Sequence, residues 1–72
     1  MTKTYLNKRR FTEHELLYLV QRINKDIIDL TYRIVDEVAE IVTIKFADGF
    51  KREVNVCGDS LHALTIDVLN RI

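Results

Sequence analysis

A short stretch near the C-terminus holds residue types that nucleophilic catalysis uses. A thiol, a carboxylate, a hydroxyl and an imidazole lie within six positions, as Cys57, Asp59, Ser60 and His62. A nucleophile beside a base and an orienting acid is the arrangement of acyl transfer. On a helix, however, His62 lies about 200° around the axis from Ser60, so these side chains face different directions. Asp59 is explained as a helix cap and Cys57 as a small apolar residue, so we predict no catalytic residue and no enzyme.

A metal site would need more donors than the chain brings together. His14 and His62 fall on two different predicted helices, with no cysteine or carboxylate at ligand spacing to support them. Glu13 and Glu15 lie near a helix start, where acidic side chains stabilise the helix dipole. We therefore predict no metal and no other cofactor.

Basic side chains gather at the N-terminus, where they could contact phosphate groups. The first ten residues contain four basic side chains and no acidic one, whereas the other 62 contain seven basic and eleven acidic ones. We interpret residues 1–10 as a basic arm that is either solvated or bound to nucleic acid. The candidate phosphate contacts are Lys3, Lys8, Arg9 and Arg10. Because the rest of the chain is acidic, nucleic-acid binding is the alternative rather than the leading hypothesis.

Acidic side chains are densest in the middle of the chain, next to apolar ones. Asp36, Glu37 and Glu40 surround Val38, with Val35 beside them. A solvated turn explains these charges, and so does a surface that electrostatic attraction guides to a basic protein. The functional interpretation predicts a partner-binding patch made of Asp36, Glu37, Val38 and Glu40.

Length and composition limit what these residues can belong to. The chain has 72 residues, 47% of them hydrophobic and 31% charged, with two glycines and no proline, which predicts one globular domain. No apolar run approaches the roughly 18 residues of a membrane span, and the N-terminus lacks the apolar core of a secretory signal. One cysteine forms no internal disulfide, so we expect a reducing, cytoplasmic environment.

The first predicted element is a helix over residues 13–25. Thr12 and Glu15 have the spacing of a capping box, which places the N-cap at Thr12. Apolar and polar residues then alternate from Ile28 to Ile34, which predicts a strand. The apolar positions also fit a heptad repeat, so one long helix from Thr12 to about Val35 is a competing prediction. The strand is favoured because the later strands need a pairing partner.

A hairpin and a second helix complete the chain. Strands are predicted over residues 41–46 and 50–57, after an acidic connector at 36–40. A three-residue loop at 47–49 is expected, because only this loop places Phe46 opposite Phe50 and Val42 opposite Val54. Gly49 should then have a positive φ. The last helix begins after Gly58, with Asp59 or Ser60 as its N-cap.

These elements predict an α+β fold in the order α-β-β-β-α over residues 11–72. A three-stranded antiparallel sheet should carry both helices packed on one face, because each strand has a single apolar face. Ile66 points away from the apolar stripe of the last helix, beside Ala63 and Asn70. The core is marginal and the sheet has open edges, so we predict a homodimer in which Ala63, Ile66 and Asn70 take part.

The element order resembles that of the double-stranded RNA-binding domain over about residues 11–72. That family has lysines at the start of its last helix, where this chain reads GDSLHA, so the resemblance implies the fold and not RNA binding. The second half, VTIKFADGFKREVNVCGDSLHALTIDVLNRI, resembles small accessory proteins of bacterial phages and mobile elements. This resemblance implies a protein that acts by binding, a class that includes inhibitors of host defence such as anti-CRISPR proteins.

The leading hypothesis is therefore a small non-catalytic binding protein of a phage or mobile element that acts on a protein partner. The alternative is a nucleic-acid-binding module that uses the basic arm. No membrane partner is expected.

Overall fold

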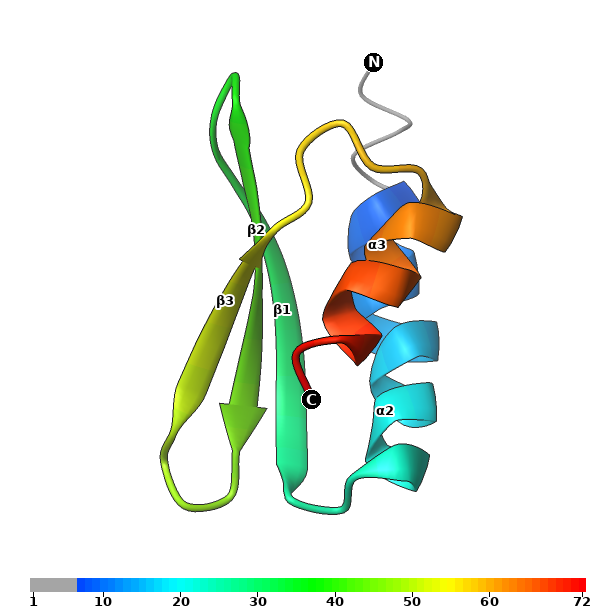
Figure 1. The fold of residues 1–72 in the computed structure, drawn as a ribbon, viewed down its shortest axis with the longest axis vertical. Helices are drawn as coiled ribbons and strands as arrows, with labels where there is room; N and C mark the ends of the chain where they lie inside the picture. The colour runs from blue at the N-terminus through cyan, green and yellow to red at the C-terminus, as the bar shows by residue number, and fades with distance from the viewer. Residues whose placement is uncertain (1–6) are drawn as a thin grey trace.

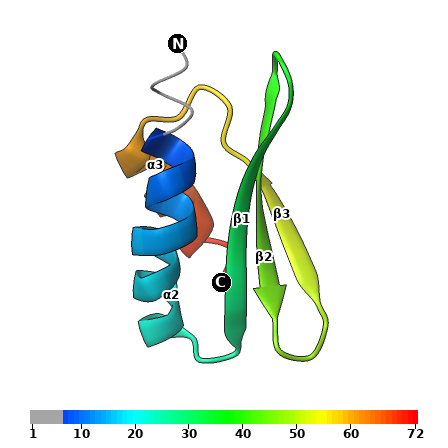
Figure 2. The ribbon, with the colours of Figure 1, turned by 180° about the vertical axis from the view of Figure 1, so that it is seen from behind.

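In the computed structural model, which describes residues 7–72, a three-stranded antiparallel sheet carries helices on one of its faces (Figure 1 and Figure 2). The elements after the helical residues 7–10 are, in chain order, η1 (Phe11–Leu16), α2 (Leu17–Ile23), β1 (Ile27–Asp36), β2 (Ala39–Phe46), β3 (Lys51–Asn55) and α3 (Leu61–Leu69). The α+β class and the predicted order are confirmed. The competing prediction of one long helix is wrong, because residues 27–36 pair with β2 as a strand.

The core lies between the sheet and the helices. Its buried apolar side chains come from every helix and strand: Leu16, Val20, Ile27, Leu30, Tyr32, Val42, Ile44, Val54, Val56, Leu64 and Val68. The opposite face of the sheet is polar, and there Arg33 of β1 forms an exposed ion pair with Glu53 of β3 at 3.0 Å. One apolar face on each strand thus accounts for both helices packing on the same side.

The N-terminal helix begins earlier than the capping box predicts. Residues 7–10 are helical, so the described end of the basic arm is continuous with the domain, and the N-cap at Thr12 is wrong. Thr12 is completely buried within η1, a π-helical segment in which Leu17 N–H donates to the Thr12 carbonyl. Glu13 lies in the same segment, and its Oε2 accepts the Tyr32 backbone N–H at 2.9 Å.

β1 contains a bulge that simple alternation does not predict. The pairing with β2 shifts between Ile27 and Asp29, so Ile27 and Leu30 are buried whereas Ile28 is 55% exposed. The prediction that Ile28 faces the core is therefore wrong. At the other end of the strand, the predicted connector over residues 36–40 is a two-residue turn at 37–38, because β2 already begins at Ala39.

The hairpin between β2 and β3 agrees with the predicted register. Val42 pairs with Val54, and Phe46 N–H donates to the Phe50 carbonyl at 2.9 Å, which confirms the three-residue loop. Gly49 has a φ of +91°, as that loop requires.

The start of α3 is also as predicted. Ser60 is the N-cap, and its Oγ accepts the Ala63 N–H at 3.2 Å. Leu64 and Val68 of α3 are buried, and Ile66 is 45% exposed on another side of the helix.

Replacing Gly49 with alanine should lower the free energy of unfolding by about 1 kcal/mol or more, because an L side chain is strained at this φ. No atom lies within 4 Å of the position of the added Cβ, so the loss would come from the backbone rather than from a clash. Gly49→Asn is the control and should lose less, since asparagine tolerates positive φ better. Urea unfolding measures all three proteins, and equal stability of wild type and Gly49→Ala would contradict the loop geometry.

Candidate functional site

A buried polar cluster joins the start of the N-terminal helix to the sheet. Lys8 Nζ lies 2.8 Å from Glu40 Oε1, and the two side chains are only 6% and 9% exposed. Tyr32 Oη donates to the same carboxylate oxygen at 2.5 Å. Burial acts to raise the pKa of Glu40, but the hydrogen bonds from Lys8 and Tyr32 and the charge of Lys8 outweigh it, so this pKa lies below its ordinary value. Glu40 is therefore an ionised, fully engaged side chain at neutral pH.

Two residues that were predicted to lie on binding surfaces are buried in this cluster. Lys8 was a predicted phosphate contact, but its ammonium is buried against Glu40. Glu40 was predicted to lie in the acidic patch, but it faces the helices from within β2. A sequence signal exists for both corrections. Lys8, Thr12 and Leu16 follow one another at four-residue spacing, and Glu40 shares the period-two face of Val42 and Ile44.

The residues suggested by nucleophilic chemistry are not brought together as a catalytic arrangement. Ser60 Oγ is engaged as a helix cap and His62 is exposed. Burial, and then the charge of Glu40, raise the pKa of the Cys57 thiol, and Cys57 Sγ lies 3.7 Å from the Glu37 carbonyl oxygen. The neutral thiol is the weakly nucleophilic form of cysteine.

Asp59 is the second ionisable group beside the cluster with a shifted pKa. A hydrogen bond with the Asp67 carboxyl, and then burial, raise the pKa of Asp59. Asp59 Oδ2 is buried without a hydrogen-bond partner.

Within residues 7–72, no three histidine, cysteine, aspartate or glutamate side chains lie close enough to hold a metal ion. No helix in that range is long and apolar enough to cross a membrane.

The β1–β2 hairpin projects beyond the helices (Figure 1). Its end carries exposed apolar side chains. We define the hairpin tip as residues 34–38. Ile34, Val35 and Val38 in the tip are 43%, 56% and 74% exposed. Asp36 and Glu37 between them are exposed too. The tip therefore contains three of the four residues predicted for the partner-binding patch, together with Ile34, which period-two alternation would have placed in the core.

The tip is held in shape by hydrogen bonds from its own turn and from the neighbouring strand. Asp36 Oδ1 accepts the Val38 N–H at 2.8 Å. Asn55, the last residue of β3, donates from Nδ2 to the Val38 carbonyl at 3.3 Å. Its Oδ1 accepts the Cys57 N–H at 3.0 Å, which fixes the orientation of the amide. The exposed apolar side chains are thus presented on an ordered turn.

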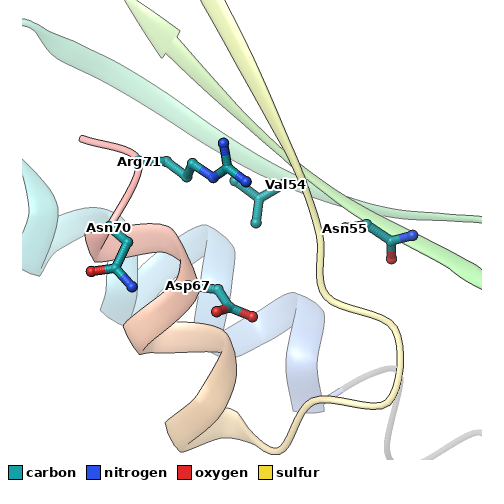
Figure 3. A pocket seen from close by; sticks show the side chains of 5 residues that line it. All are labelled: Val54, Asn55, Asp67, Asn70 and Arg71. Carbon is teal, nitrogen blue, oxygen red and sulfur yellow. The ribbon is translucent and has the colours of Figure 1, made fainter.

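The remaining predicted residues lie on other surfaces. Arg9 and Arg10 are exposed on the N-terminal helix, and Lys3 lies outside the described residues. Asn70, of the strip predicted for self-association, lines a groove of about 430 Å³ between β3 and α3. Figure 3 shows the lining residues, which are Val54 and Asn55 from β3, Asp67 from α3, and Asn70 and Arg71 just after it.

Comparison of the chain with models of protein families, with curated proteins and with solved structures finds no match. The resemblances to the double-stranded RNA-binding domain and to phage accessory proteins therefore stay predictions.

Lys8→Met should destabilise the fold by about 3 kcal/mol, because it leaves the buried carboxylate of Glu40 without its counter-charge. Adding Glu40→Gln to Lys8→Met should recover most of this loss, since the double variant buries no charge and keeps an acceptor for Tyr32. Chemical denaturation of the single and double variants measures the difference. If the single and double variants were equally unstable, Lys8 would stabilise the fold by something other than its ion pair with Glu40.

Asp59→Asn should make the protein more stable at pH 7. Because the folded-state pKa of Asp59 is raised, the folded protein holds this proton more tightly, and stability falls as the pH rises from the ordinary value of 3.8 through the raised pKa. The side-chain amide of the variant is uncharged at every pH. Its advantage in stability over the wild type should therefore disappear below pH 3.8, where the Asp59 carboxyl is also uncharged. Glu40 acts in the opposite direction, since its lowered pKa gives stability that is complete above 4.5 and lost on acidification. Thermal unfolding of wild type and Asp59→Asn across this pH range checks the sign.

Proposed function

We propose that this protein is a non-catalytic binding protein that docks on a protein partner through the hairpin tip. The observation that carries the proposal is the exposure of Ile34, Val35 and Val38 on an ordered, projecting turn. Clustered aliphatic side chains in water are unfavourable unless a partner covers them, and such patches commonly mark interaction sites. Three such exposed side chains lie within five residues at the end of this hairpin.

The charges of the tip favour a basic partner surface. Asp36 and Glu37 lie between the apolar side chains, so a complementary site would have an apolar floor and a basic rim. Opposite charges at the rim speed association and select against acidic competitors. Because the turn is already held by Asn55 and by the Asp36 side chain, binding would cost little ordering of the backbone.

The resemblance of residues 42–72 to accessory proteins of phages and mobile elements supports a partner of a particular kind. We propose that the partner is a bacterial host protein and that docking inhibits it, as an anti-defence protein would. A basic rim around an apolar floor is the expected surface of a nucleic-acid-handling host protein, since such proteins bind phosphates through basic residues.

Replacing Val35 and Val38 together with serine should raise the Kd for the captured partner about tenfold or more, since both exposed apolar contacts are lost. The matched control is Ile28→Ser, which removes an equally exposed β-branched side chain at the other end of β1. Immobilised wild type, double variant and control are compared for capture from bacterial lysate, and the captured protein is then titrated in purified form. Loss of capture by the control as well as the double variant would contradict the assignment to the tip.

The charge of the tip and the nucleic-acid alternative are tested in the same assay. Glu37→Lys brings the net charge of the tip from −2 to zero, so it should weaken binding and remove most of its dependence on salt. Asp36 is left intact because it accepts a hydrogen bond within the turn. Nuclease treatment should leave capture unchanged. If nuclease, or the pair Arg9→Glu and Arg10→Glu, abolished capture while the tip variant retained it, the basic arm and not the tip would be the binding surface.

A further inference from the structure

The two edges of the sheet differ in how their backbone groups are satisfied. In β1, Tyr32 N–H donates to Glu13 Oε2 and Leu30 N–H donates to Asp29 Oδ1, both at 2.9 Å. Neighbouring outward-facing positions of an antiparallel strand are two residues apart, so these are successive outward N–H groups. Two carboxylates thus occupy two successive donors that a further strand would need, which disfavours pairing along the middle of the β1 edge.

The edge of β3 is open. Phe46 N–H donates to the Phe50 carbonyl and Val56 N–H donates to the Glu40 carbonyl, so even-numbered residues of this segment face β2. Antiparallel alternation then directs the backbone groups of Lys51, Glu53 and Asn55 outward. β3 has only β2 as a neighbour, and within the described part of the chain no other residue pairs with these outward backbone groups.

Space for an added strand exists beside this edge. The groove of about 430 Å³ runs between β3 and α3, and its walls are Val54 and Asn55 on one side and Asp67, Asn70 and Arg71 on the other (Figure 3). A strand that pairs with β3 would direct alternate side chains into this groove and the others onto the open face of the sheet.

We propose that the edge of β3 pairs with β3 of a second copy of this chain, antiparallel about a two-fold axis, with Lys51 opposite the partner subunit's Glu53. This register forms two opposite-charge pairs on the open face of the sheet, one on each side of the axis. The register centred on Glu53 would instead oppose two carboxylates, which is unfavourable. Glu53 uses Oε2 for its own exposed ion pair with Arg33. Its other oxygen is left for the partner's lysine.

The residue on the two-fold axis in this register is Arg52, whose charge is held by its own chain. Arg52 Nη1 donates to the Arg71 carbonyl at 3.0 Å, and its guanidinium lies 5.6 Å from the centre of the Phe50 ring. These contacts tie each guanidinium to its own chain.

The outer side of α3 supplies the rest of the interface. Ala63, Ile66 and Asn70 lie within about 60° of one another around the helix axis, and Asn70 lines the groove beside β3. Pairing of the two β3 strands would bring this strip toward the same strip of the second copy. The inference is independent of the hairpin tip, which lies at another part of the sheet, and the dimer would carry two such tips.

The test is the mass of the protein in solution, measured by sedimentation equilibrium and light scattering over a range of concentrations that reaches tens of micromolar. Wild type should be a dimer there. Lys51→Glu and Glu53→Lys should each raise the dimer dissociation constant about tenfold, because two attractive pairs become two repulsive ones. Combining both changes restores the opposite charges and should return the constant to near the wild-type value. Lys25→Glu makes the same charge change in an exposed turn and should have no effect.

Two further variants test the backbone and the helix. Glu53→Pro removes an outward N–H that the monomer does not use, a place where edge strands tolerate proline, and should give a folded monomer. Ile66→Glu spares the buried stripe of α3 and should also shift the mass toward monomer. A monomeric wild type at every concentration overturns the proposal. A dimer that resists the single charge changes, or that the double change does not restore, overturns the pairing of β3 strands even if Ile66→Glu dissociates it.

Discussion

The buried contact between Lys8 and Glu40 is the constraint on which the rest of this structure depends. A charged pair removed from water must be matched closely, and here Tyr32 supplies a further hydrogen bond to the same carboxylate. The three side chains come from the N-terminal helix, β2 and β1, so one cluster fixes the helix on the sheet. It accounts for a helix that begins before Thr12, and it takes both a basic and an acidic residue away from the surface.

The placement of the helix in turn decides which edge of the sheet stays open. Once Lys8 is docked, the π-helical turn of η1 brings Glu13 to the backbone of β1, where its carboxylate accepts the Tyr32 N–H. Glu13 and Asp29 thus occupy two successive outward donors of β1, whereas the outward groups of β3 have no partner within the described part of the chain.

Asn55 connects this open edge to the hairpin tip. Its backbone groups belong to the outward row of β3, whereas its side chain holds the turn at Val38 and the backbone at Cys57. Asn55 therefore belongs both to the open edge of the sheet and to the support of the turn.

Local signals in the sequence were enough to determine the strand order, the register of the β2–β3 hairpin, the positive φ of Gly49 and the cap of α3, because each depends on residues within a few positions of one another. They also placed three of the four patch residues at the surface. The tertiary structure decided the start of the first helix and the bulge that exposes Ile28. It also decided that the charge of Glu40 is buried, although its position on the period-two face of Val42 and Ile44 was visible in the sequence. The reason is physical. Lys8 and Glu40 are 32 residues apart, and a charged side chain is expected to face water unless the fold brings an opposite charge into contact with it.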